Sequence, residues 1–466
     1  MAMVFCYDPE FTGIDNNFIY PVIRQLQGGS IYPDPEQYPF PVNPYAPLLF
    51  YLSAFFCKLL GITGTDPIQV YFITRGICLL ADLITLFVLY RILKRFAGIA
   101  TIPALFATVA FFFLISYWSF TVMRSDSLLL LFYSLILYTL LLYIEKPRTM
   151  QLLLIVLLCN AAIFSKQNGI YMPFMVTGIF ILTGKFRAAW MFPVIFAGIF
   201  ALLLLLFTSI YQNHFFSHLV TALNNRIDVR WFYQYIFKRL AESFVIIPFA
   251  TGCWYAFQNF RRPPNLVIKT VSIAALCSVA FSLLIAFKWG SSIAYFNESM
   301  LALTILLALL LKNTEGLTVI RKMATAGLFC IAIVYAHIAL QLFFYHLNNF
   351  QEDRKVYQDQ KTLSEELLAM IGKDDVYVFA DDVNGTFFKN SMRDRLVAPN
   401  KDAIDCCTLP DGNFNYTLFK EGFANGKIRY LVFQEQWVPE RFHDVSLRHY
   451  KKIKGRFGYA IYEYRQ

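Results

Sequence analysis

Carboxylates that could take part in chemistry lie beside long apolar segments of this 466-residue chain. Asp8 and Asp15 lie near its start, and Asp126 lies at the head of an apolar run. A carboxylate placed in this way can act as a general base that orients or deprotonates a nucleophile. The alternative for Asp8 and its neighbour Glu10 is that both are solvated loop acids.

Basic side chains form a second set, and each lies between apolar segments. They are Arg124, Lys166, Arg226 and Lys288. A charge close to hydrocarbon costs ~2.5–3.5 kcal/mol, so such residues usually pair or act. Cations at a membrane interface suit an anionic phosphate. The alternatives are an anchoring pair of Arg124 with Asp126 and lysines that merely extend to the interface.

The composition shows what kind of protein carries these groups. Hydrophobic residues make up 57% of the chain and charged residues only 15%, whereas a soluble domain has about 25% charged residues. The chain is therefore too apolar for a soluble enzyme, and it is neither disordered, disulfide-stapled, collagenous nor a coiled coil. This composition predicts a polytopic membrane protein.

Ten apolar runs approach the length needed to cross ~30 Å of hydrocarbon. They are Tyr71–Leu93, Ile99–Tyr117, Leu128–Ile144, Leu152–Phe164, Ile170–Thr183, Ala189–Ile210, Phe244–Phe257, Val271–Phe287, Ile293–Leu311 and Ala324–Phe344. An eleventh run, Tyr45–Leu60, contains Pro47 and Lys58. We expect it to form a helix that lies in the outer interface with its apolar face in lipid.

Charge in the loops predicts the orientation. One set of alternate loops holds 13 cations against Glu145 and Glu315: Arg91, Lys94, Arg95, Lys146, Arg148, Lys185, Arg187, Arg261, Arg262, Lys269, Lys312, Arg321 and Lys322. Cytoplasmic loops are enriched in Lys and Arg, so this set is expected inside. Both termini and all candidate site residues are then outside. Met1–Tyr7 is too short for a signal peptide, so we expect a first transmembrane helix to be missing from this sequence.

The C-terminal part has a different composition. Residues 346–466 hold 18 basic and 18 acidic residues, which leaves 23 basic and 13 acidic residues for 1–345 and places the whole excess of +10 there. We therefore do not interpret the basic charge as nucleic-acid binding.

A polar helix is predicted over 346–373. The segments DDVYVFA, KIRYLVFQ and GYAIYEYR, with LVAPN as a further candidate, follow as strands. The predicted fold is thus mainly α, with an extracytoplasmic segment (1–70), a transmembrane helix bundle (71–345) and a small extracytoplasmic α/β domain (346–466). That last domain could contact an acceptor, cover the site or only stabilise the protein.

No metal or cofactor is indicated by the sequence. The nine cysteines and six histidines show no metal-ligand spacing. The chain also lacks a Gly-rich phosphate loop and a Rossmann pattern, so a soluble nucleotide-sugar site is not expected.

The order of these parts resembles the C-type glycosyltransferases, which use polyprenyl-phosphate sugars. Within them it resembles the branch of the protein O-mannosyltransferases and the lipid A aminoarabinose transferase. The resemblance covers roughly residues 8–345. Four motifs carry it: Asp15 with Gly28-Gly29 and NPYAPLLFYL, Arg124-Ser125-Asp126, Lys166-Gln167-Asn168-Gly169, and Lys288-Trp289-Gly290 with Tyr295. The family often has an Asp-Glu pair where this chain has Asp15-Asn16, which leaves Asp8 as a second candidate, although the spacing to the glycine favours Asp15.

This resemblance implies transfer of one sugar, with inversion, from a polyprenyl-phosphate donor to a lipid, glycan or protein acceptor. Asp15 would be the general base, and Asp126 would help to hold the acceptor or the base. The basic residues, Lys166, Lys288, Arg226 and Arg124, would bind the donor phosphate and stabilise the charge on the leaving group. The enzyme would lie in the plasma (inner) membrane with its active site on the extracytoplasmic side.

Two other interpretations remain open. A lipid or sugar transporter would favour internal repeats and charges at the membrane midplane, and no clear repeat is present. A non-catalytic relative could act as a membrane scaffold.

Overall fold

The computed structural model describes most of the chain. The described residues are 5–7, 15–118, 124–222, 226–242, 245–312, 318–372, 374–380, 386–399, 403–404, 406, 414–435, 441–442 and 445–465. The candidates Asp8 and Glu10 lie outside these ranges.

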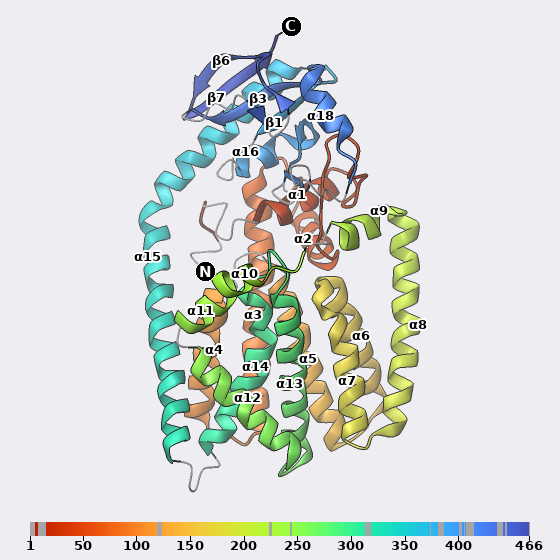
Figure 1. The fold of residues 1–466 in the computed structure, drawn as a ribbon, viewed down its shortest axis with the longest axis vertical. Coiled ribbons are helices and arrows are strands. Elements are labelled where there is room, and N and C mark those ends of the chain that lie inside the picture. Colours follow the sequence, from red (N-terminus) through yellow and green to blue (C-terminus); the bar gives the residue numbers. More distant parts are fainter. Residues whose placement is uncertain are drawn as a thin grey trace. The chain divides into compact units, whose positions relative to one another are not determined.

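Helices form at each of the ten predicted apolar runs, with ends that differ by a few residues except in α15, which continues to Ile371 through the predicted polar helix (Figure 1). They are α3 (Pro67–Arg95), α4 (Thr101–Trp118), α5 (Ser125–Glu145), α6 (Thr149–Ser165), α7 (Tyr171–Leu182), α8 (Phe186–Tyr211), α12 (Ile246–Arg261), α13 (Leu266–Ala286), α14 (Asn297–Lys312) and α15 (Thr318–Ile371). The short helices η2 (Gln167–Ile170) and η5 (Ile293–Phe296) precede α7 and α14.

Five of the described helical segments are long and apolar enough to cross a membrane, and six are if one bent pair counts as a single span. The five are α3, α5, α8, α13 and η5 with α14, and the bent pair is Val229–Ala241 with Ile246–Arg261. The apolar helices α4, α6 and α7 are shorter. The chain is therefore an integral membrane protein, and the predicted mainly α fold class is confirmed.

The chain divides into two compact units. Unit 1 consists of Met1–Ile77, Leu206–Asn224 and Phe344–Gln466, and unit 2 consists of Cys78–Leu205 and Asn225–Phe343. In unit 1 the N-terminal segment packs with the C-terminal α/β part.

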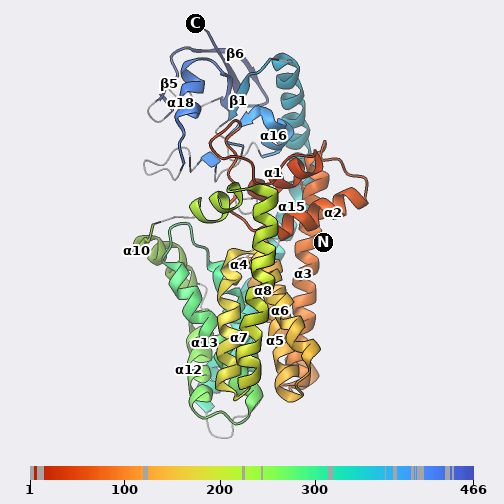
Figure 2. The same cartoon turned by 90° about the vertical axis from the view of Figure 1, so that its right-hand side faces the viewer.

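Unit 2 is a helical bundle in which α5 packs along α6, and α12, α13 and α14 pack together (Figures 1 and 2). Leu129, Tyr133, Ile136 and Leu140 are buried at helical spacing along α5, so they form one core-facing stripe. In contrast, only 6% of the most apolar window of α8 is buried inside the protein. An apolar helix with so little protein around it faces lipid over most of its surface.

Several short elements connect the long helices. They are α9 (His214–Phe216), the π-helices η3 (Ser217–Thr221) and η4 (Phe232–Phe237), α10 (Val229–Trp231) and α11 (Lys238–Glu242).

Unit 1 contains a five-stranded mixed sheet in the order β2-β1-β3-β7-β6 (Figure 1). Its strands are β1 (Tyr377–Ala380), β2 (Leu396–Val397), β3 (Ile428–Gln434), β6 (Tyr450–Arg456) and β7 (Tyr459–Tyr464). Strand β1 pairs in parallel with β2 and β3, whereas β7 pairs antiparallel with β3 and β6. The remaining elements are α16 (Thr386–Ser391), η7 (Arg393–Arg395), α18 (Thr417–Ala424), β4 (Arg441–Phe442) and β5 (Val445–Ser446).

Four of the five strands in this sheet lie where the sequence predicts them, whereas β6, like the short strands β4 and β5, was missed. Its lysines, Lys451, Lys452 and Lys454, are exposed and interrupt the apolar alternation that marks a strand. Strand β6 is an edge of the sheet, and lysines on an edge discourage pairing with another chain.

Two helices and a Tyr/Pro-rich loop make up the N-terminal part of unit 1. Helix α2 (Leu48–Leu59) follows α1 (Asp15–Leu26) and the loop. Phe40 and Val42 of the loop are fully buried in the core of the α/β part. The loop is therefore part of that core rather than a solvated connection.

Helix α2 has the length and surface of the predicted interfacial helix. Its 12 residues span only about 18 Å, too short to cross a bilayer. One face is buried, while Phe55 and Leu59 are 60% and 68% exposed. Its place in the interface stays a prediction.

His218 holds both ends of the Tyr/Pro-rich loop. The backbone N–H of Asn43 donates to His218 Nδ1 over 2.9 Å, and His218 Nε2 lies 2.6 Å from the carbonyl oxygen of Pro33. Because that carbonyl can only accept, Nε2 carries the proton and the ring is neutral. Burial lowers the pKa of His218 from 6.5 to about 4.

This shift predicts a stability loss in acid. Above pH 6.5 His218 is neutral in the folded and the unfolded chain, and between pH 6.5 and about 4 only the unfolded chain takes up the proton. The resulting decrease in the free energy of unfolding should approach about 3 kcal/mol at pH 4. The measurement compares apparent unfolding temperatures of wild type and His218→Gln between pH 7.5 and 4.5. The wild type should lose more stability than the variant, and equal losses would contradict the role of His218.

Candidate functional site

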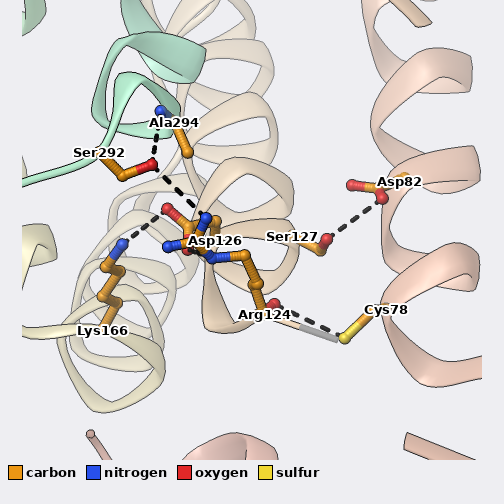
Figure 3. A network of polar contacts seen from close by, with 8 residues as sticks. All are labelled: Cys78, Asp82, Arg124, Asp126, Ser127, Lys166, Ser292 and Ala294. Atoms are coloured by element: carbon orange, nitrogen blue, oxygen red, sulfur yellow. Dashed lines mark hydrogen bonds and ion pairs between the residues drawn. The ribbon is translucent and has the colours of Figure 1, made fainter. Parts of the chain in front are cut away.

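Three charged side chains meet in unit 2, and we call Arg124, Asp126 and Lys166 the charge cluster (Figure 3). Lys166 Nζ lies 2.6 Å from Asp126 Oδ1, and Arg124 Nε lies 3.4 Å from Asp126 Oδ2. The side chains of Asp126 and Lys166 are only 5% and 8% exposed. Two cations thus share one carboxylate, and the cluster carries one excess positive charge.

The ends of the paired helices α5 and α6 position the cluster. Arg124 has an extended backbone immediately before α5, and Asp126 lies in the first turn of that helix. A carboxylate is favoured there because the first turn presents unbonded N–H groups and the positive end of the helix dipole. Lys166 follows α6, again with an extended backbone.

The glycine at position 169, close after Lys166, is required by its packing against α6. A Cβ atom at Gly169 would lie 2.7 Å from the backbone carbon of Ala162, so only glycine fits. Gly169 also donates its N–H to the carbonyl oxygen of Lys166 over 2.9 Å. The motif therefore keeps η2 against the end of α6 and directs Lys166 towards Asp126.

Polar groups of other helices support Arg124 and the start of α5 (Figure 3). Ser127 Oγ donates to Asp82 Oδ2 of α3 over 3.1 Å, and Cys78 Sγ of α3 lies 3.5 Å from the carbonyl oxygen of Arg124. Arg124 Nη1 lies 3.5 Å from Ser292 Oγ, a weak contact, and Ser292 Oγ also accepts from the N–H of Ala294. Asp82, an acid within the helix α3, is thus bonded to the residue after Asp126.

An aromatic ring and a second acid complete the surroundings of Lys166. Its ammonium lies 4.4 Å from the centre of the Tyr295 ring, within the range of a cation–π contact. Glu298, in the first turn of α14, is 5% exposed and interacts electrostatically with Asp126 and Lys166.

Arg226 and Lys288 come together at a different place in unit 2. The segments that carry them form a short antiparallel bridge in which the N–H of Trp289 donates to the carbonyl oxygen of Arg226 over 2.9 Å. Burial lowers the pKa of Lys288. Among the described residues, no hydrogen bond or ion pair joins either cation to the charge cluster. The connection from α13 to η5 nevertheless holds both Lys288 and Ser292, the partner of Arg124.

Asp15 lies in unit 1 as the first residue of α1. Its Oδ2 lies 3.7 Å from Arg75 Nη2, and both side chains are completely buried. Arg75 Nη1 also donates to the carbonyl oxygen of Cys6 over 2.9 Å, and the guanidinium lies 5.2 Å from the centre of the Tyr71 ring. Asp15 is therefore a buried, ion-paired carboxylate at a helix start rather than a solvated loop acid.

Two residues of these sites were missed in the sequence. Arg75 lies in the predicted run Tyr71–Leu93, and Glu298 lies in Ile293–Leu311. The signal for both is a charged residue within an apolar run, because such a residue usually pairs or acts.

The arrangement suits an anion better than a metal. Within the described part of the chain, no three His, Cys, Asp or Glu side chains gather as a metal site requires. Two partly screened cations at the end of an apolar bundle can instead bind a phosphate that is attached to an apolar chain.

The comparisons with known proteins agree with this chemistry. Residues 43–211 match the family described as dolichyl-phosphate-mannose-protein mannosyltransferase. No curated protein matches the sequence. The fold is similar to that of ArnT from Cupriavidus metallidurans bound to undecaprenyl phosphate, with 14% identity, a TM-score of 0.61, and coverage of 97% of this chain and 92% of that chain.

Two archaeal structures have the same fold. The Archaeoglobus fulgidus oligosaccharyltransferase in complex with Zn and sulfate matches with 13% identity and a TM-score of 0.55 over 92% of this chain and 66% of that chain. AglB from the same organism, with an inhibitory peptide and a dolichol-phosphate, matches with 12% identity and a TM-score of 0.53 over 92% of this chain and 67% of that chain. The fold that the resemblance implies is thus confirmed, and the family match covers residues 43–211.

The geometry of the charge cluster predicts that substitutions of its members destabilise the protein to different extents. Asp126→Asn leaves two buried cations together and should destabilise the protein by ~3–5 kcal/mol, whereas Lys166→Met leaves Asp126 with Arg124 and should cost less. The double variant should be more stable than Asp126→Asn alone. Apparent unfolding temperatures in detergent test this order, and additive losses in the double variant would contradict the ion pair.

Proposed function

We propose that this chain, a membrane protein with the fold of ArnT and AglB, is a glycosyltransferase that uses a polyprenyl-phosphate sugar. It transfers one sugar to a lipid, glycan or protein acceptor. The observation that carries the proposal is the charge cluster, in which two cations are held by one carboxylate at the end of an apolar helix pair. The match to the mannosyltransferase family supports it.

The cluster would bind the phosphate of the donor. The leaving group of such a donor is a polyprenyl phosphate, on which negative charge develops as the sugar bond breaks. Lys166 and Arg124 are already fixed by Asp126, so little reorganisation is needed to stabilise that charge. The complexes of ArnT with undecaprenyl phosphate and of AglB with a dolichol-phosphate support a donor of this class.

Lys288 and Arg226 would assist as a second pair of cations. Their segments are joined by backbone hydrogen bonds, so the two residues would act as one unit. Burial lowers the pKa of Lys288, and a phosphate beside it would favour the charged ammonium form.

Asp15 would be the general base that deprotonates or orients the acceptor. Its ion pair with Arg75 would hold the carboxylate in place at the start of α1. Asp126, which is occupied by two cations, would position those cations and would not act as a base. The sugar could be a hexose or a pentose.

The enzyme would work on the extracytoplasmic side of the plasma (inner) membrane. Helices α5 and α6 place Arg124 and Lys166 at one end of the pair and Lys146 and Arg148 at the other. Because the second end belongs to the loops rich in cations, it would face the cytoplasm. Residues 1–70 and 346–466 would then be extracytoplasmic, and the bundle 71–345 would lie in the membrane.

An activity assay tests the reaction. The full chain in nanodiscs is mixed with radiolabelled polyprenyl-phosphate sugars and a membrane extract as the source of acceptor. Lys166→Met should lower kcat/KM at least ~100-fold because it removes a charge that stabilises the leaving group, and Asp15→Asn should abolish transfer. Lys146→Met, an exposed lysine at the opposite end of α5, is the matched control. If the folded wild-type protein transfers sugar from none of the donors, the proposal is contradicted.

Orientation has its own test. A short epitope inserted after Arg148 should be reached by antibody only in inside-out vesicles, and one added after Gln466 only in right-side-out vesicles. The reverse pattern would overturn the proposed side of the active site without touching the proposed chemistry.

A further inference from the structure

Unit 1 contains a cavity of about 550 Å³ that the proposed reaction does not use. Its lining residues come from the end of α1, the end of α15 and the segment around β1 and η7. They are Gln27, Leu368, Gly372, Tyr377, Asp394 and Arg395. The volume is typical of sites for small molecules, which range over about 300–1,000 Å³.

The two charged residues of the cavity are held in place by the protein. Asp394 Oδ1 accepts from Arg24 Nη1 over 2.5 Å and from the hydroxyl of Tyr20 over 3.3 Å. Arg395 Nη1 donates to a backbone carbonyl oxygen over 2.8 Å in the segment that leads into β1. A ligand that hydrogen-bonds to Asp394 or Arg395 therefore meets groups that are already ordered, which lowers the entropic cost of binding.

An aromatic wall lies beside these polar groups. The ring of Tyr377 stacks on that of Tyr38 with centroids 4.4 Å apart. Lys427 Nζ lies 4.9 Å from the Tyr38 ring and 5.8 Å from the Tyr377 ring. Tyr377 is only half-buried, so the wall combines an apolar surface with a hydroxyl group.

The charges around the cavity balance. Among the lining residues the charged ones are one acid, Asp394, and one base, Arg395. A phosphate site needs an excess of cations, as in the charge cluster of unit 2. The cavity therefore favours a neutral ligand.

A sugar ring has the complementary chemistry. Its C–H groups form apolar patches that pack on an aromatic ring, and its hydroxyls both donate and accept hydrogen bonds. Gln27 and Asp394 offer acceptors, and Gln27 and Arg395 offer donors, so neighbouring hydroxyls could each find a partner.

We propose that this cavity binds a neutral sugar residue of a glycan-bearing acceptor. The proposal that a sugar binds here is argued from the cavity alone. The proposal that this binding selects the acceptor rests on the proposed glycosyltransferase function. The proposal narrows the acceptor to a molecule that already carries a neutral glycan.

A binding experiment tests the site on the full chain in nanodiscs. The probe is an array of neutral di- to tetrasaccharides of hexose and N-acetylhexosamine. Gln27→Trp fills the cavity from an exposed position after α1, so the fold should tolerate it. Gln25→Trp, two residues earlier and outside the lining, is the matched control.

Wild type and Gln25→Trp should bind the same oligosaccharides, and Gln27→Trp should bind them at least tenfold more weakly. Inorganic phosphate should not displace them. A second variant, Asp394→Asn, should weaken binding while it keeps an acceptor for Arg24. Absence of binding by wild type, or equal binding by Gln27→Trp, would overturn the proposal.

Transfer kinetics separate this proposal from the proposed function. If wild type transfers sugar, Gln27→Trp should raise the KM for acceptor and leave the KM for donor unchanged, and an unchanged acceptor KM would overturn the role in acceptor selection. If wild type transfers no sugar but binds oligosaccharides in a Gln27-dependent manner, the proposed function fails and the sugar site stands.

Discussion

The arrangement of the candidate site depends on the burial of Asp126 between two cations. Lys166 and Arg124 come from segments that are 42 residues apart in sequence, and their mutual repulsion would separate them without the carboxylate. The apolar surroundings strengthen each attraction, and they also make the loss of one partner costly. Because both cations share one carboxylate, the geometry that they present to an anion is fixed in advance. Gly169, Ser127 and Tyr295 then all serve to maintain that geometry.

This dependence explains why the polar groups gather at helix ends. The backbone of a helix satisfies its own hydrogen bonds except in its first and last turns. Helix ends are therefore where a membrane protein can best place charged side chains, and here the start of α5 meets the end of α6. Unit 1 uses the same device, because Asp15 is the first residue of α1 and is paired with Arg75 of α3.

Much of the fold could be predicted from the sequence. Apolar runs mark every long helix, and the switch to balanced charge near residue 345 marks the α/β part. Strand β6 was missed because its lysines hide the alternation, and an edge position cannot be seen before the sheet order is known.

The sequence also marked Arg124, Asp126 and Lys166 as candidates, since charges near hydrocarbon are rare. The sequence also allowed for the pair of Arg124 with Asp126, which the structure contains. The pairing of Lys166 with Asp126, the pairing of Asp15 with Arg75 and the burial of Glu298 depend on which helices touch, and periodicity does not encode that. The Tyr/Pro-rich loop shows the same limit, because Phe40 and Val42 pack on strands more than 300 residues away.

The most direct test of the account is binding of a polyprenyl phosphate to the charge cluster. Native mass spectrometry of the full chain would compare undecaprenyl phosphate with the uncharged alcohol undecaprenol, for wild type and Lys166→Met. The account predicts that wild type retains the phosphate in preference to the alcohol, and that Lys166→Met loses this preference while Lys146→Met keeps it. Equal retention of phosphate and alcohol by wild type, or an unchanged preference in Lys166→Met, would contradict a phosphate-binding role for the cluster.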